Sequence, residues 1–321
     1  MFDVIYDGKL DEQAGKEVFS KAISDLAHAD KEVIYLDADL MNSSGTYALW
    51  SDIPEQVIES GIQESNMIGV AAGLSVVGRK PYCHSFAPFV SRRSYDQIFI
   101  SIAYAGNSVR VYGSDPGVTA AFNGGTHMPF EDLSLYRAIP EATIFDIADA
   151  AQFDWVIREV KDRPGLSYFR YTRKSYSRIY SKDSTFEIGK GNLIRDGKDL
   201  TIFATGLMLG EAMQAAEALE SEGISIRVVD MFTVKPLDEE MVIRCAKETG
   251  AILTTENHNI IGGLGDAVGS CLAQNNICVP FRKHGVMDQF GQVGDQAYLQ
   301  EVFGLTAENL IGEAKKVISQ K

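Results

Sequence analysis

A single carboxylate, Glu64, stands at the start of a segment, residues 61–74, that is rich in small residues. A glutamate in the first turn of a helix is favoured by the helix dipole, so Glu64 taken alone is a structural residue. The helix that it opens is nevertheless unusually rich in small residues for a surface helix, and Gly69 and Gly73 allow another element to pack closely. Phe86 and Phe89 follow about twenty positions later, and taken alone they are core residues.

Further candidate residues lie next to predicted strands and loops. Asp39 and Leu40 follow the apolar run Val33 to Leu36, and the carboxyl ends of strands are where α/β sheets commonly bind ligands. The simpler alternative is an ordinary strand end. His127 closes a glycine-rich loop, and a neutral imidazole there could exchange protons near neutral pH. A lone histidine in a loop is otherwise a structural residue.

Helix-like and strand-like segments alternate along the chain, which predicts an α/β fold with largely parallel sheets flanked by helices. The first half has helical spacing over residues 17–28 and 64–77. The predicted strands and other buried segments cover residues 33–36, 98–105, 109–112, 143–147, 166–171, 200–205, 224–230 and 251–255, and helical spacing returns over residues 209–222 and 238–248.

The segment Thr172 to Gly191 is polar and lacks periodicity, as expected of a segment that crosses between domains. We therefore expect two domains, residues 1–185 and 186–321. A chain of 321 residues is long enough for each to bury a core of its own.

The chain is acidic, with 44 Asp and Glu against 30 Lys and Arg and a net charge of −14. Its basic residues are scattered, which disfavours a nucleic-acid-binding surface. Neither a secretion signal nor an apolar run long enough for a membrane span is evident. The four cysteines form no Cys-x-x-Cys pair and are expected to be buried thiols. We place the protein in the cytoplasm, away from membranes.

Three motifs in series resemble the pyrimidine-binding domain of transketolases. They are Gly-x-x-Glu ending at Glu64, Phe-x-x-Phe at Phe86 and Phe89, and Asp-Gln-Ile at residues 96–98. Deoxyxylulose-phosphate synthase and the beta subunits of 2-oxo-acid dehydrogenases read similarly. The resemblance implies thiamine diphosphate as the cofactor, with Glu64 hydrogen-bonded to its aminopyrimidine and the two phenylalanines stacking on that ring.

The same resemblance assigns the remaining cofactor and substrate residues. Asp39 and Leu40 match the Asp-Leu of the family, where the leucine supports the cofactor's bent conformation. Residues 114–127, with Glu131-Asp132-Leu133, resemble the transketolase substrate loop, in which His127 faces the sugar. Arg173 matches the arginine that binds the sugar phosphate, for which its planar charged fork is suited; Lys16 and Ser43 are further members of that site.

Two positions of the substrate loop depart from the family pattern. Most transketolases carry histidine where Asp115 stands and aspartate where Asn123 stands, and both usually touch the sugar. An acid in place of the histidine is expected to repel a phosphate. The resemblance therefore implies sugar phosphate substrates, with an altered phosphate site.

The last third of the chain resembles the carboxy-terminal domain of transketolases. The motif residues are 226–238, Thr255-Glu256-Asn257-His258, and the glycines of residues 262–265. In that family the domain mainly supports dimer packing, so we expect no catalytic residue here.

Full-length transketolases hold the diphosphate through a divalent cation bound by a Gly-Asp-Gly segment, and no such segment occurs in this sequence. We therefore expect the chain to be the catalytic half of a two-subunit transketolase. An amino-terminal subunit would hold Mg²⁺ and the diphosphate, and the assembly would contain two copies of each chain. Two alternatives stay open: a 2-oxo-acid dehydrogenase beta subunit, against which Arg173 and Glu131-Asp132-Leu133 argue, and a non-catalytic module that kept the fold.

Overall fold

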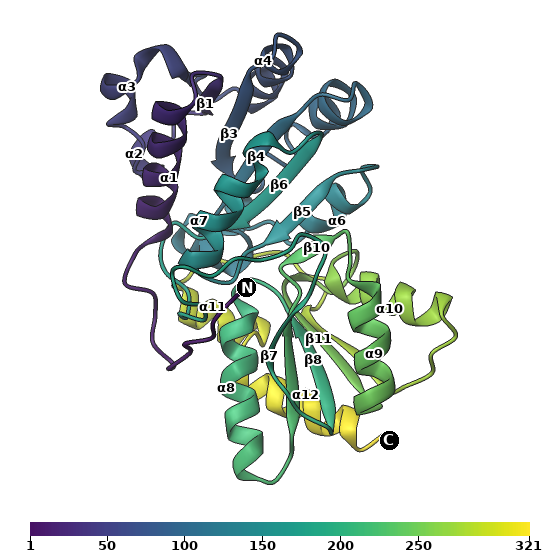
Figure 1. The fold of residues 1–321 in the computed structure, drawn as a ribbon. Coiled ribbons are helices and arrows are strands. Elements are labelled where there is room, and N and C mark those ends of the chain that lie inside the picture. The colour runs from purple at the N-terminus through teal and green to yellow at the C-terminus, as the bar shows by residue number, and fades with distance from the viewer.

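The computed structural model describes all 321 residues and contains two α/β units, each built around its own sheet (Figure 1). The seven strands of the first sheet lie in the order β10-β5-β6-β4-β3-β1-β2, and all neighbours except β10 and β5 are parallel. Its strands are β1 (Val33–Asp37), β2 (Val57–Glu59), β3 (Lys80–Phe86), β4 (Val109–Ser114), β5 (Thr143–Asp146), β6 (Leu166–Tyr171) and β10 (Thr233–Lys235).

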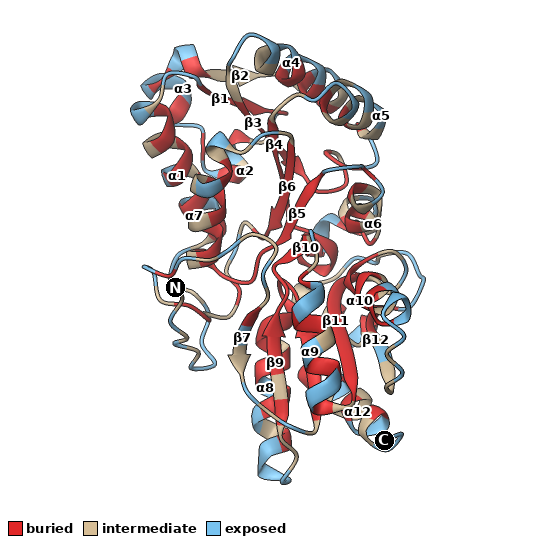
Figure 2. Ribbon diagram, turned by 45° about the vertical axis from the view of Figure 1, so that its right-hand side comes forward, coloured by how far each residue is buried: buried red, intermediate tan, exposed pale blue.

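Helices cover both faces of the first sheet. Alternate residues of a strand point to opposite faces, so Tyr35 of β1 packs with α1 and α7, whereas Ile34 and Leu36 pack with α4, η2 and α6. Figure 2 shows the strands buried between these layers. The helices and short turns of this unit are α1 (Gly15–Ala29), α2 (Met41–Ser44), α3 (Leu49–Asp52), η1 (Pro54–Gln56), α4 (Glu64–Val76), α5 (Tyr95–Gln97), the π-helix η2 (Ile98–Tyr104), η3 (Gly117–Asn123), η4 (Gly125–His127), α6 (Asp132–Arg137), α7 (Ala150–Glu159) and η5 (Val160–Asp162).

The second sheet has five strands in the order β12-β11-β8-β9-β7, of which only β7 is antiparallel to its neighbour. Helices α8 and α12 pack on one face, and α9 and α10 pack on the other. The elements are β7 (Asn192–Arg195), β8 (Leu200–Ala204), α8 (Met208–Ser221), β9 (Ile226–Asp230), α9 (Glu239–Thr249), β11 (Ile252–Asn259), α10 (Leu264–Gln274), β12 (Phe281–Val286), α11 (Gln296–Phe303) and α12 (Ala307–Ile318).

The predicted α/β class is confirmed, and the two units are more closely joined than the sequence indicated. Strand β10 lies late in the sequence but pairs with β5 at the edge of the first sheet. The segment Thr172 to Gly191 contains no helix or extended strand, and two isolated bridges tie it to the amino-terminal residues 4 and 10. The boundary near residue 185 stays a prediction.

Two other sequence expectations concern cysteines and membranes. Three of the cysteines are buried thiols, as expected, but Cys278 is exposed, because it lies in the loop between α10 and β12. No helix of the structure has both the length and the apolar character needed to cross a lipid bilayer.

Candidate active site

Glu64 is the first residue of α4, and its side chain is only 2% exposed. Nη1 of Arg93 donates to both carboxylate oxygens, at 3.0 and 2.9 Å, and the hydroxyl of Ser85 donates to one of them at 3.3 Å. The arginine side chain is 43% exposed and its guanidinium lies 3.9 Å from the centre of the Phe89 ring. A buried carboxylate is therefore held at the helix start by a partly exposed arginine that also stacks on an aromatic face.

Three rings form a continuous wall next to this carboxylate. Phe86 lies at the carboxyl end of β3, and its ring centre is 6.3 Å from that of Phe89. The imidazole of His127 packs edge-on against both rings, at 5.5 and 5.0 Å. The structure thus brings together the glutamate, the aromatic pair and the histidine that the sequence predicted for one site.

The environment of His127 favours its neutral form. Burial lowers the pKa of His127 below the usual 6.5, and the positive charges of Arg93 and Arg92 lower it further. One ring nitrogen, Nδ1, lies 2.9 Å from the hydroxyl of Thr126. Near pH 7 the imidazole is therefore uncharged and able to accept a proton.

Arg173 extends the row of side chains beyond Phe86, since its guanidinium lies 4.7 Å from the centre of that ring. Its Nε donates to the carboxylate of Asp115, and its main-chain N–H donates to the other carboxylate oxygen at 2.8 Å. The sequence led us to expect that Asp115 repels a phosphate; in the structure it also balances the charge of the arginine that would bind one. Asp115 adopts a left-handed φ of 53°, a conformation that occurs mostly at turns and functional sites.

The other predicted residues lie farther from this row. The main-chain N–H of Lys16 donates to the carbonyl of Arg173 at 3.1 Å, and the helix that contains Ser43 abuts Lys16 through Gly45. Asp39, with a left-handed φ of 62°, is exposed, and Leu40 is half-buried, both just after β1. Asn123 is exposed at the end of η3 and makes no side-chain hydrogen bond.

A buried hydrogen-bond network, which the sequence did not reveal, supports the loops that follow β1, β3 and β4. Nδ1 of His84 donates to Asp37 at 2.8 Å, and its Nε2 lies 3.0 Å from the hydroxyl of Ser114. Asp37 also accepts the main-chain N–H of Leu40. Asp37, His84 and Ser114 lie at or near the carboxyl ends of three adjacent strands and are completely buried, so they position the loops and are not open to a substrate.

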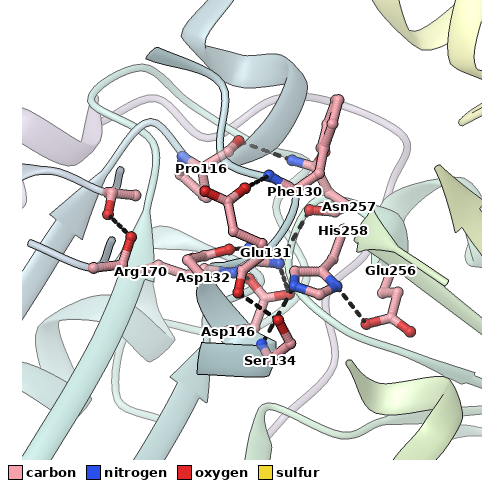
Figure 3. Close-up of polar contacts among 12 residues, drawn as sticks. Pro116, Phe130, Glu131, Asp132, Ser134, Asp146, Arg170, Glu256, Asn257 and His258 are labelled. Carbon is pink, nitrogen blue, oxygen red and sulfur yellow. Dashed lines mark hydrogen bonds and ion pairs between the residues drawn. The ribbon is translucent and has the colours of Figure 1, made fainter. Parts of the chain in front are cut away.

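The second unit contributes directly to the substrate loop. The side-chain amide of Asn257, at the carboxyl end of β11, accepts from Val118 N–H at 3.0 Å and donates to the Pro116 carbonyl at 2.9 Å (Figure 3). Gly117 between them has a φ of 55°, and a Cβ there would lie 2.1 Å from the Asn257 amide oxygen. From the sequence we expected no catalytic residue in this unit and noted Asn257 only as part of a family motif. Nothing in its position along the chain indicates that it holds the substrate loop in place.

The residues present fit the aminopyrimidine of thiamine diphosphate. A buried carboxylate beside an aromatic wall matches a flat heterocycle that carries a hydrogen-bonding nitrogen. In this structure Arg93 occupies both oxygens of the same carboxylate. No group of three or more His, Cys, Asp or Glu side chains is arranged to hold a metal ion.

Comparison with known proteins gives the family. The model for the pyrimidine binding domain of transketolase matches residues 11–178, and the model for the transketolase C-terminal domain matches residues 189–310. The chain belongs to the transketolase family. It resembles a 6-deoxy-6-sulfo-D-fructose transketolase subunit of Clostridium sp. (strain MSTE9), with 44% identity over 98% of each chain.

Two further transketolases show which part of the enzyme this chain represents. A solved split gene transketolase, an inactive beta4 tetramer, has a TM-score of 0.86 and 37% identity, covering 95% of this chain and 98% of its own. The transketolase of Rattus norvegicus is 31% identical over 97% of this chain, which spans only 50% of the rat protein. The predicted resemblance to the carboxy-terminal subunit of a split transketolase is confirmed.

Proposed function

We propose that this chain is the catalytic half of a two-subunit, thiamine-diphosphate-dependent transketolase that transfers a two-carbon ketol unit between sugar phosphates. The observation that carries the proposal is the unbroken row of side chains that starts at Glu64, passes through its partner Arg93, and continues over Phe89, His127 and Phe86 to Arg173. One end of this row fits a pyrimidine ring, and the other end presents an arginine suited to the anionic end of a sugar.

Each residue of the row has a distinct role in this proposal. When bound, thiamine diphosphate supplies a thiazolium carbon that becomes nucleophilic on losing a proton. Glu64 holds a proton on the pyrimidine ring nitrogen, and Phe86 and Phe89 orient the ring. His127 is the neutral base that accepts a proton from a sugar hydroxyl, while Arg173 fixes the far end of the sugar.

Asp39, Leu40, Ser43, Asp115 and Asn123 complete the proposed site around this row. Asp39 and Leu40 lie at the same edge of the parallel sheet as Phe86 and Asp115, because each of the four lies at or just after the carboxyl end of its strand. Their proposed task is to line the cofactor and substrate channel. Mg²⁺ and the diphosphate are assigned to an amino-terminal partner subunit.

The outer face of α4 supports the proposed assembly with that partner. Its exposed residues are uncharged, and Glu64, the one charged residue of the helix, is buried. Val76 and Val77 are 71% and 70% exposed, and Tyr104 on the neighbouring η2 is 84% exposed. Such apolar patches mark protein contacts. We propose a complex with two copies of each chain. The split-gene relative is itself described as an inactive beta4 tetramer.

Replacing Gly73 on this face with leucine is expected to prevent assembly with the amino-terminal subunit. A Cβ at Gly73 meets no atom within 4 Å, so the isolated chain should fold at least as well, since glycine costs a helix about 1 kcal/mol relative to good helix formers. Sedimentation of the mixed subunits measures assembly. Gly312→Leu in α12, another open helical glycine, is the matched control and should assemble normally. Normal assembly of Gly73→Leu would remove this face from the interface.

The activity of the reconstituted pair is expected to fall as the pH drops through the lowered pKa of His127, because protonation removes the proposed base. The optimum should therefore extend below pH 6.5 on the acid side. His127→Asn should lower kcat about 100-fold and abolish this acid limb. A profile of kcat/KM against pH for both proteins checks the prediction, and an unchanged acid limb in the variant would assign the titration to another group.

Mixing the chain with an amino-terminal transketolase subunit, thiamine diphosphate and Mg²⁺ tests the proposed function. Ketol transfer from D-fructose 6-phosphate or another ketose is the expected result. Decarboxylation of pyruvate in place of ketol transfer would favour a 2-oxo-acid dehydrogenase subunit. If the assembled complex does not bind thiamine diphosphate in a calorimetric titration, the chain is a non-catalytic module.

A second candidate donor is a ketose that ends in a sulfonate, as in the name of the Clostridium relative. The ion pair between Asp115 and Arg173 favours it, because that pair presents less positive charge to the sugar than a free arginine does.

A further inference from the structure

Asp115 and Arg173 form a fixed ion pair at the substrate end of the row. The aspartate side chain is 3% exposed and the arginine side chain is 25% exposed. One carboxylate oxygen accepts from the Arg173 main chain at 2.8 Å and from the Thr172 hydroxyl at 3.3 Å, while the other accepts from the Arg173 guanidinium. Three hydrogen bonds therefore hold the negative charge against the arginine.

The surroundings of the pair add little charge. Tyr112 and Tyr176 pack near Asp115, and burial raises the pKa of both far above its ordinary value, so they stay neutral. His127, on the far side of Phe86, is neutral near pH 7. Lys16 contacts Arg173 through the main chain, where its N–H donates to the Arg173 carbonyl at 3.1 Å. An anion that binds at Arg173 thus meets an arginine whose charge is already balanced.

The number of charges on the sugar's terminal group then decides how well it binds. A phosphate monoester carries about 1.5 to 2 negative charges at pH 7, with a second pKa of about 6. A sulfonate carries a single charge throughout this pH range. Each additional negative charge near Asp115 is repelled, and this repulsion is strong where water is partly excluded. A singly charged group gains contact with Arg173 at a smaller electrostatic cost.

We propose that Asp115 is a specificity-determining residue that favours a sugar with a singly charged terminal group, such as a sulfonate, over its doubly charged phosphate counterpart. The proposal rests on the ketol transfer proposed above. The proposal concerns only the preference for a sulfonate-ended ketose over a phosphate-ended one, and the phosphate-ended ketose remains a substrate.

Asp115→Asn is the variant that tests the proposal. Asparagine has the same shape, tolerates the left-handed φ of 53°, and keeps an oxygen for the Arg173 main-chain N–H. The reconstituted pair is assayed with 6-deoxy-6-sulfo-D-fructose and D-fructose 6-phosphate, each with uncharged D-glyceraldehyde as acceptor. We expect the ratio of kcat/KM, sulfonate over phosphate, to fall about tenfold or more in the variant. A ratio within twofold of the unmodified complex would overturn the proposal.

A matched control and a second readout complete the experiment. Asp288→Asn removes another aspartate with a left-handed φ, of 45°, from an exposed loop, and should leave the ratio unchanged. In the unmodified complex the ratio should also fall as the pH is lowered from about 8 to about 5.5, because the phosphate loses its second charge below about pH 6. A ratio that does not change with pH would overturn the proposal even if the variant failed to fold.

The outcomes separate this proposal from the proposed function. Transfer from the uncharged ketose L-erythrulose, measured in the same preparations, reports ketol transfer without any terminal anion. If erythrulose is used but the ratio responds neither to Asp115→Asn nor to pH, the specificity proposal fails and the function stands. If no ketose is used by the unmodified complex, the proposed function fails and this proposal fails with it.

Discussion

Changing Glu64 to alanine is expected to lower ketol transfer by the reconstituted pair about 1,000-fold. The carboxylate is nearly fully buried at the start of α4, and Arg93 links it to the aromatic pair of Phe86 and Phe89. Positioned acid–base groups typically contribute factors of 10² to 10⁴. The loss should appear in kcat and persist at saturating thiamine diphosphate, since extra cofactor restores binding but not the hydrogen bond to the pyrimidine.

The fold should tolerate the Glu64 change. Its partner Arg93 is 43% exposed and can be solvated by water when the carboxylate is removed. The buried Ser85 hydroxyl loses its acceptor, so the free energy of unfolding should fall by about 1–3 kcal/mol. Glu55→Gln, at an exposed position of η1 without an ion pair, is the control and should retain full activity. Full ketol transfer by Glu64→Ala would contradict the assignment of this residue.

Changing Arg170 to methionine is expected to destabilise the chain by about 3–5 kcal/mol. This arginine of β6 is completely buried where the two units meet (Figure 3). It donates to Asp132 at 2.8 Å, to both oxygens of Asp146 at 2.9 and 2.8 Å, and to the Asn257 carbonyl at 3.2 Å. Its removal leaves two buried carboxylates without their counter-ion.

Urea unfolding at a fixed protein concentration measures this effect. Combining Arg170→Met with Asp132→Asn and Asp146→Asn should restore much of the lost free energy, because the unpaired charges are then removed as well. Arg282→Met breaks a partly exposed ion pair with Glu313 and should cost less than about 1 kcal/mol. If Arg170→Met and Arg282→Met cost the same, the buried cluster does not stabilise the junction between the units.

The cluster around Arg170 also links the site to the second unit. Asn257 accepts one hydrogen bond from the substrate loop, and the next residue, His258, accepts the main-chain N–H of Ser134 at 3.4 Å. Burial lowers the pKa of His258 to about 4, so its imidazole is neutral and can accept that hydrogen bond at neutral pH. The loop that contains His127 is therefore positioned partly by Asn257, which lies 139 positions beyond its hydrogen-bond partner Val118.

The local elements followed closely from the sequence. The apolar run at residues 33–36 forms β1, and the small-residue segment after Glu64 forms α4, because strand and helix formation depend on nearby residues and their periodicity. The motif spacing also identified Glu64, Phe86, Phe89 and His127, which the structure brings into one wall. Strand β10 was not predicted as part of the first sheet, since nothing in its short sequence indicates which sheet edge it joins.

The sequence alone determined that this is a two-unit α/β protein with the motif residues of a transketolase pyrimidine site. Only the tertiary structure decided how those residues are paired. Asp115 and Arg173 lie 58 positions apart and meet because Ser114 of β4 and Tyr171 of β6 are partners in adjacent parallel strands. Arg93 reaches Glu64 because its loop folds back over α4. Such pairings depend on strand order and loop path. The residue types along the chain therefore do not reveal that Asp115 balances the charge of Arg173 at the end of the site that would bind the sugar's terminal group.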